Sequence, residues 1–227
     1  MRIWAGFAIA ATIVAVVAAC GGGSSPSNSP PPAPRDSFAA NIFPLAPPAF
    51  TCVPPGAATV TVMQKLNAFW QSGVVPCACD AALLAAFCAH NAFASPQTFG
   101  YIFYDAAFLN SLDVSSGSTL PADFFIAHEF GHNIQLALGL VLVGQAKELN
   151  ADCLGGYYVG FQARKNLVSL ADLQKTFAFA CSIGDTFPSN WWDSTHGICP
   201  QRVAAMNQGF NGNLQGLLPG QACPASI

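Results

Sequence analysis

Two histidines and a glutamate stand at a spacing that suits metal chemistry, in the run His128-Glu129-Phe130-Gly131-His132. On a helix of 3.6 residues per turn, His128 and His132 lie about 40° apart on one face. Two imidazoles so placed can chelate one zinc ion. Glu129 lies beside them and can reach a metal-bound water without ligating the metal. The pattern therefore predicts a zinc site with Glu129 as its general base.

A second acidic pair, Glu148 and Asp152, has the same four-residue spacing. A catalytic zinc takes three protein ligands and keeps one position open, so Glu148 is the predicted third ligand. Asp152 would share its face and accept the other ring N–H of a ligating histidine. Glu129 and Glu148 are the only two glutamates in the chain, and both belong to this pattern.

Simpler explanations of these residues exist. The histidine motif can arise by chance on a solvated helix, and Glu148 can be a helix-start acid favoured by the helix dipole. A closed structural zinc would need a fourth ligand, for which Cys153 is the candidate. Because Cys153 points away from the Glu148 and Asp152 face of a helix, a disulfide is the better interpretation.

The elements that must position these residues are mostly helical. Apolar residues at nearly every position predict that the helix from Pro121 to about Gly139 is buried. Another helix is expected over 148–161, where Gly155, Gly156 and Gly160 require either very close packing or an early break. Further helices are predicted over 62–70, 80–87, 170–180 and 200–209, the 170–180 helix with a capping box of Ser169 and Asp172, and a strand over 100–105. That strand is a possible edge for an extended peptide.

The N-terminus is predicted to direct export. Residues 1–19 combine Arg2, an apolar stretch and small residues before Cys20, which is typical of a signal peptide of the lipoprotein type. Cys20 would carry the lipid, residues 20–37 would form a flexible Gly/Ser/Pro linker, and residues 38–227 would form the domain. The expected location is a bacterial envelope, with the domain anchored to a membrane and facing the periplasm or the exterior.

Cysteine count and charge agree with an exported enzyme. Without Cys20, eight of the nine cysteines remain, an even number that predicts a disulfide framework with undetermined pairing. Charged residues make up only 8% of the chain and the net charge is -3, so no basic surface is available for nucleic acid.

Four sequence blocks resemble the neutral zinc metallopeptidase family of bacteria. They are AHEFGHNIQ (127–135), ELNADCLGGYY (148–158), SIGD (182–185) and HGICPQRVAAMNQGF (196–210), in the family's order and within about half of the chain. The resemblance implies a compact α+β domain with one zinc held by His128, His132 and Glu148, the arrangement of glutamate-liganded zinc peptidases. It also implies Glu129 as base and Asp152 as the acid after the third ligand.

The sequence thus predicts a mostly helical α+β, disulfide-stapled domain with an active-site helix and a small sheet. The expected activity is zinc-dependent hydrolysis of a peptide or protein substrate. His196 is the candidate for stabilising the oxyanion, followed by Tyr157, Tyr158 and Arg202, although Arg202 can equally pair with Asp185 or Asp193. The alternative function is a catalytically idle, metallopeptidase-like lipoprotein that binds an envelope partner. Hydrolysis of non-protein amides is a further alternative.

Overall fold

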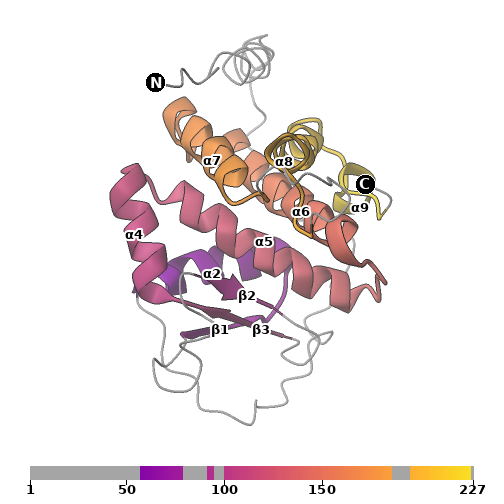
Figure 1. Cartoon of the computed structure of the whole chain (residues 1–227), viewed down its shortest axis with the longest axis horizontal. Coiled ribbons are helices and arrows are strands. Elements are labelled where there is room, and N and C mark those ends of the chain that lie inside the picture. The colour runs from indigo at the N-terminus through magenta and orange to yellow at the C-terminus, as the bar shows by residue number, and fades with distance from the viewer. Residues whose placement is uncertain (1–56, 79–90, 95–99, 186–194, 226–227) are drawn as a thin grey trace. The chain divides into compact units, whose positions relative to one another are not determined.

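The structure is a computed structural model that describes residues 57–78, 91–94, 100–185 and 195–225. The predicted leader, Cys20 and the linker lie outside the described residues, as does the helix expected over 80–87. None of the helices in the described part has the length and hydropathy of a membrane-spanning segment. The described elements of the domain are helices with one small sheet (Figure 1), which confirms the mostly helical α+β class.

The sheet has three strands in the order β1-β3-β2 among the described residues. The strands are β1 (Val75–Ala78), β2 (Ala92–Phe93) and β3 (Tyr101–Tyr104). β1 runs parallel to β3 and β2 runs antiparallel to it, with Ala92 opposite Tyr104. The aromatic strand predicted over 100–105 is therefore correct, but its proposed role as an edge is wrong. All four β3 residues are buried, and β1 and β2 are the outer strands among the described ones.

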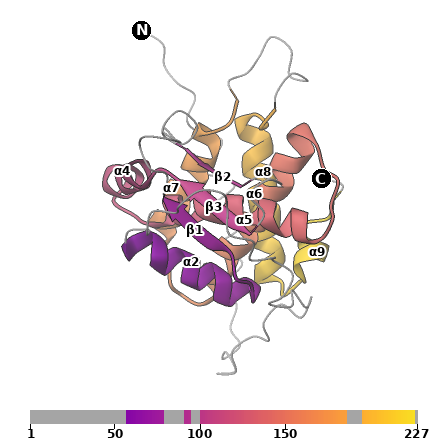
Figure 2. The ribbon, with the colours of Figure 1, turned by 90° about the horizontal axis from the view of Figure 1, so that it is seen from below.

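Helix α5 (Leu120–Ala137) lies between the sheet and the helices α6, α7 and α8 (Figure 1). Every residue from Leu120 to Gln135 is buried, as the apolar composition of this segment predicts. Asn133 joins α5 to the sheet, since its side chain accepts the Gly100 N–H and donates to the Tyr101 carbonyl. The helix that carries the histidine motif is thus fixed on both sides. Figure 2 shows the same elements from the sheet side, with α2 (Ala57–Trp70) beside the strands.

Helices α6 (Gly144–Arg164) and α8 (Cys199–Leu214) pack closely along a seam of glycines. A Cβ on Gly156 would lie 2.0 Å from the Met206 carbonyl oxygen, and one on Gly209 would lie 1.8 Å from that of Cys153. The sequence left open whether the glycines of α6 allow very close packing or end the helix early, and close packing is correct. α6 also begins four residues before Glu148, and α8 extends five residues beyond the predicted Gly209.

The remaining helices close the domain. α4 (Ala106–Ser116) is capped by the Asp105 side chain and was not predicted from the sequence. α7 (Leu170–Ser182) begins with the expected capping box of Ser169 and Asp172. α9 (Pro219–Ala222) is a short C-terminal turn.

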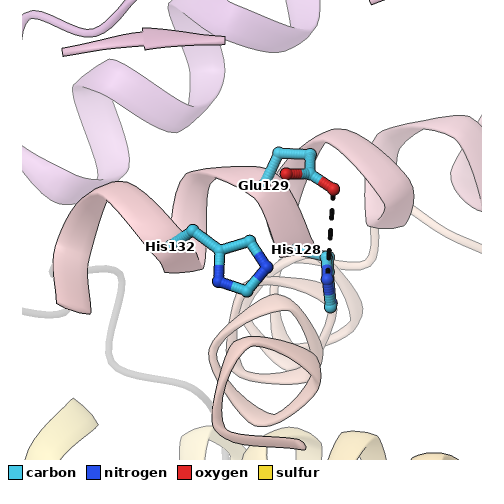
Figure 3. Close-up of side chains that lie close together, drawn as sticks. All are labelled: His128, Glu129 and His132. Atoms are coloured by element: carbon cyan, nitrogen blue, oxygen red, sulfur yellow. Dashed lines mark ion pairs between the residues drawn. The ribbon is translucent and has the colours of Figure 1, made fainter. Parts of the chain in front are cut away.

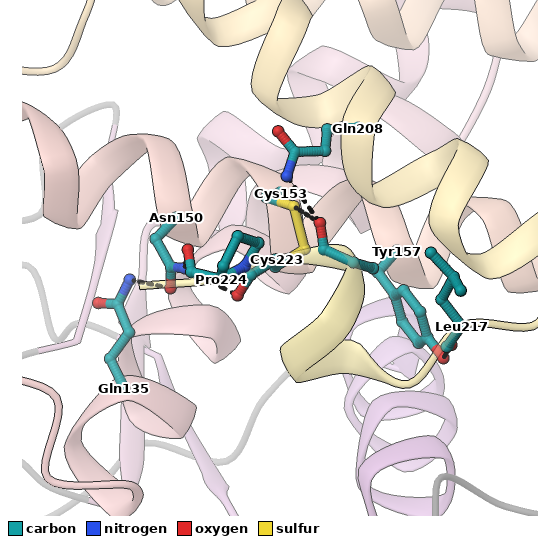
Figure 4. Close-up of a disulfide and its surroundings, with 9 residues drawn as sticks. Gln135, Asn150, Cys153, Tyr157, Gln208, Leu217, Cys223 and Pro224 are labelled. Carbon is teal, nitrogen blue, oxygen red and sulfur yellow. Dashed lines mark hydrogen bonds between the residues drawn. A yellow bond between two sulfur atoms is a disulfide. The ribbon is translucent and has the colours of Figure 1, made fainter. Parts of the chain in front are cut away.

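Two disulfides that join described cysteines confirm that the domain is stapled. Cys153 on α6 bonds to Cys223 beside α9 (Figure 4), and Cys181 on α7 bonds to Cys199 at the start of α8. The preference for a disulfide at Cys153 over metal ligation is therefore correct.

Candidate metal centre

The predicted metal ligands lie together where α5 packs on α6. Glu148 Oε2 is 3.2 Å from His128 Nε2 and 3.4 Å from His132 Nε2. The three side chains are almost fully buried. Glu148 follows His128 by 20 positions and His132 by 16. The packing of α5 on α6 nevertheless brings its carboxylate oxygen close to both ring nitrogens.

Both imidazoles are held by their other ring nitrogen. His128 Nδ1 lies 2.8 Å from Asp152 Oδ1, as the sequence predicts. His132 Nδ1 lies 3.0 Å from Gln135 Oε1, a contact that the sequence reasoning missed. With each Nδ1–H donating to its oxygen, each Nε2 is the nitrogen that can give its lone pair to a metal bound beside Glu148. The i+3 spacing of Gln135 from His132 on one helix is the signal that would have identified it.

Gln135 also connects the centre to the C-terminal segment. Its amide nitrogen donates to the Lys147 carbonyl and to Asn150 Oδ1. The Asn150 amide in turn donates to the carbonyls of Cys223 and Pro224, next to the Cys153–Cys223 disulfide (Figure 4). The orientation of His132 therefore depends on a hydrogen-bonded chain that reaches the end of the domain.

Glu129 lies beside the histidines, not between them (Figure 3). Its Oε1 is 4.0 Å from His128 Nε2, farther than the Glu148 oxygen, and its Oε2 accepts the backbone N–H of Ala94. One carboxylate oxygen is thus held by the sheet side, while the other faces the histidine pair.

Asp152 is fully buried and is neutralised by Arg202 from α8. The guanidinium donates from Nε to Oδ2 and from Nη2 to Oδ1, both at 2.7 Å, and from Nη1 to the Ile183 carbonyl. The sequence did not predict this pair with Asp152, and of the partners that it offered, Asp193 lies outside the described residues. Arg202 also lines the cleft beside the centre, so its role at the oxyanion stays a prediction. The bidentate pair supplies a counter-charge to a carboxylate that has no exposed surface.

The surrounding charges shift the acid–base equilibria of the centre. Burial alone would lower the pKa of His128, but the carboxylates of Asp152, Glu148 and Glu129 outweigh it and raise that pKa to about 10. Burial raises the pKa of Glu129, opposed by the two histidines. Burial acts in the same sense on Glu148, but hydrogen bonds from both histidines hold its pKa far below the usual range. Without a metal, the surrounding carboxylates therefore favour the protonated, positively charged form of His128, and the same carboxylates would favour a cation at this point.

These residues fit a tetrahedral ion. Ligand atoms bound at about 2.0 Å around a tetrahedral zinc are separated by about 3.3 Å. The two distances from Glu148 Oε2 to the ring nitrogens are 3.2 and 3.4 Å. His128, Glu129 and His132 also form a group with ligand atoms within 4.8 Å of one another, but Glu129 is the more distant carboxylate and already accepts the Ala94 amide. Of the two carboxylates, Glu148 thus has the oxygen that lies nearer to the ring nitrogens.

A cleft of about 430 Å³ opens beside the centre. It is lined by the predicted ligands and Glu129, by edge strand β2, by apolar side chains that include Phe108, Phe125 and Ile183, and by His196. Tyr157 and Tyr158 are buried in the core and do not line it, so they are wrong as oxyanion candidates.

His196 reaches the cleft on a segment tied to Asp185. Asp185 Oδ2 accepts the His196 backbone N–H at 2.9 Å, and Oδ1 lies 3.3 Å from His196 Nδ1. The Cys181–Cys199 disulfide closes the base of this segment. The imidazole is more than half exposed, with Nδ1 turned toward Asp185 and Thr195. Its Nε2 is the nitrogen left to meet a ligand in the cleft.

Comparison with known proteins assigns no function. No family model matches the chain, and no solved structure matches it. The chain is 29% identical to uncharacterized proteins of Mycobacterium bovis and of two strains of Mycobacterium tuberculosis. The match covers 42% of this chain and 42% of each relative, so less than half the length of these relatives is spanned.

Proposed function

We propose that the chain is a zinc-dependent peptidase of the neutral zinc metallopeptidase type, with one zinc held by His128, His132 and Glu148. The observation that carries the proposal is the approach of one Glu148 oxygen to both ring nitrogens at the separation of tetrahedral ligands. Zinc, when bound, would polarise the scissile carbonyl and make water more acidic.

Glu129 is the general base in this proposal. Its Oε1 faces the histidines while the Ala94 amide fixes Oε2, so the carboxylate is held in one orientation. It would take a proton from the attacking water and deliver it to the leaving amine. Burial supports this role because it raises the pKa of Glu129 and makes the carboxylate a stronger base.

His196 would donate from Nε2 to the oxygen that gains negative charge, with Asp185 holding Nδ1. An extended peptide can approach along β2, which lines the cleft and has one edge unpaired among the described strands. A peptide or protein substrate fits this open cleft with a strand at its side.

We also propose that the protein is exported and anchored to a membrane through a lipid on Cys20. The disulfides support an oxidising compartment, because such bonds persist in exported proteins and are rare in the cytoplasm. The anchor itself rests on the sequence pattern around Cys20.

The decisive experiment measures zinc content and hydrolysis of casein or quenched peptides for wild type, Glu129→Gln and Glu148→Gln. Glu129→Gln should keep one zinc and lose about 10²- to 10⁴-fold in kcat, the usual contribution of a general base. Glu148→Gln should lose zinc as well as activity. Full activity in Glu129→Gln would refute the mechanism. Zinc without hydrolysis in the wild type would instead favour a lipoprotein that binds an envelope partner.

Two further variants test the oxyanion assignment. His196→Ala should lower kcat with zinc content unchanged, because His196 meets the substrate and does not ligate the metal. Asp185→Asn should lower kcat by less, since it only disturbs the orientation of the ring. Equal kcat in wild type and His196→Ala would remove His196 from the site.

A further inference from the structure

The turn between α5 and α6, residues 138–143, exposes a cluster of aliphatic side chains. Leu138 is 53% exposed, Val141 92% and Val143 77%, and the intervening Leu140 and Leu142 are partly exposed. Single exposed aliphatic residues are common on proteins, whereas a contiguous group indicates an interaction surface. The position of this aliphatic turn at the ends of the two helices can be followed in Figure 1.

The aliphatic turn is held in place by its backbone. Gly139 adopts a φ of +65°, and the Leu140 N–H donates to the Gln135 carbonyl, which closes the C-terminal turn of α5. Gln135 also donates to the Lys147 carbonyl in the first turn of α6. The apolar side chains are thus presented from a fixed base.

The aliphatic turn departs from the usual chemistry of a helix start. Val143 occupies the N-cap of α6 and makes no capping hydrogen bond, at a position where Ser, Thr, Asp or Asn is strongly favoured. No ionisable residue occurs from Asn133 to Ala146. A segment that has neither a capping side chain nor a charged residue has the composition of a surface that contacts an apolar phase.

The small area of the aliphatic turn favours lipid over a second copy of the chain. The turn has only six residues, whereas each partner in a standard protein interface contributes about 20–30 residues and buries about 800 Å². A bilayer needs no matching surface, and a chain tethered to it meets the membrane at high effective concentration. A short apolar segment beside a lipid anchor also supplies the second attachment that stable membrane binding requires.

We propose that the aliphatic turn inserts among the acyl chains of the bilayer to which the protein is anchored. The inference rests on the proposed anchor at Cys20 and not on the peptidase activity. Because the turn follows the helix of His132 and precedes Lys147, which lines the cleft, its insertion holds the cleft close to the membrane surface. The substrates would then be peptide segments that lie near the bilayer.

The lipid requirement follows from charge. The aliphatic turn carries none, the chain has only eight lysines and arginines, and the net charge is -3. Insertion should therefore occur in zwitterionic phosphatidylcholine and should not increase when anionic phosphatidylglycerol is added.

Tryptophan fluorescence in the anchored full chain tests the proposal. The chain is purified from membranes and reconstituted into phosphatidylcholine vesicles with brominated acyl chains, which quench a nearby indole. Val141→Trp is compared with Val114→Trp on α4, a control site that is 76% exposed and lies outside the turn. Each signal is taken as the increment over the four native tryptophans.

Insertion predicts that brominated lipid removes at least half of the increment from Trp at 141 and leaves the increment at 114 unchanged. Equal, unquenched increments would overturn the proposal. An unquenched increment at 141, together with a dimer that Val141→Asp converts to monomer in sedimentation, would assign the turn to a second copy instead. Failure of the chain to associate with vesicles would reject both the anchor and the insertion. None of these outcomes depends on zinc or peptide hydrolysis.

Discussion

Arg202→Gln should destabilise the domain strongly, because it removes the bidentate guanidinium partner of a buried carboxylate. Asp152 has no exposed surface and Arg202 is 3% exposed, and two hydrogen bonds of 2.7 Å join them. Removing one partner of such a buried pair costs about 3–5 kcal/mol, much more than an exposed pair contributes. The free energy of unfolding should fall by this amount in Arg202→Gln.

The measurement is urea denaturation of the metal-free, disulfide-intact protein, followed by circular dichroism. Arg164→Gln is the matched control, because Arg164 also crosses from α6 to α8 but makes one hydrogen bond, to the Asn213 carbonyl, from an exposed position. Its loss should stay near 1 kcal/mol. Metal-free protein is needed because bound zinc would add its own stabilisation.

A double-mutant cycle separates the ion pair from a general packing effect. Asp152→Asn removes the charge that Arg202 neutralises, so the double variant should be more stable than the sum of the single losses predicts. Additive losses, or an Arg202→Gln loss no greater than that of Arg164→Gln, would refute the assignment of Arg202 as the counter-ion.

Two further predictions concern stability. Burial raises the pKa of Asp123 to about 6, against the attraction of Lys65. The folded state therefore binds the Asp123 proton more tightly than the unfolded state does. As pH rises from about 4 to 6, the free energy of unfolding should fall by up to about 3 kcal/mol. Asp123→Asn should flatten that slope in urea denaturation, and an unchanged slope would reject the shift. Gly156→Ala should cost more than about 3 kcal/mol because the added Cβ would meet backbone of α8, whereas Gly220→Ala, with open space around it, should change stability by less than about 1 kcal/mol. Similar thermal stability of these two variants would contradict the close helix packing.

Much of the helical scaffold and the core of the site could be predicted because their signals are local. The four-residue spacing places His128 beside His132 and Glu148 beside Asp152 whatever the rest of the chain does. The capping box at Ser169 and the buried character of α5 are equally local properties. The pairing of His128 with Asp152 followed from the chemistry of metal-ligating histidines.

The features that were missed depend on contacts between distant segments. Arg202 is 50 residues from Asp152, and no sequence period indicates that α8 brings them together. β3 is central because β1 and β2 pair with it from both sides, which its own aromatic sequence does not reveal. The α4 helix lacked a periodic apolar pattern strong enough to be identified, although Asp105 is a recognisable cap.

The glycines of α6 explain how the site obtains its buried counter-ion. A helix with Gly155, Gly156 and Gly160 has poor intrinsic stability, at roughly 1 kcal/mol for each glycine. Because Gly156 and Gly160 lack side chains, α8 can approach until backbone nearly touches backbone, whereas Gly155 faces Phe124 of α5. At that separation the Arg202 side chain reaches Asp152, whose carboxylate also holds His128. The glycines that lower the helix propensity of α6 therefore allow the contacts that hold the His128 imidazole rigid at the proposed metal centre. A larger residue in the glycine seam should separate Arg202 from Asp152, loosen His128 and so weaken zinc binding.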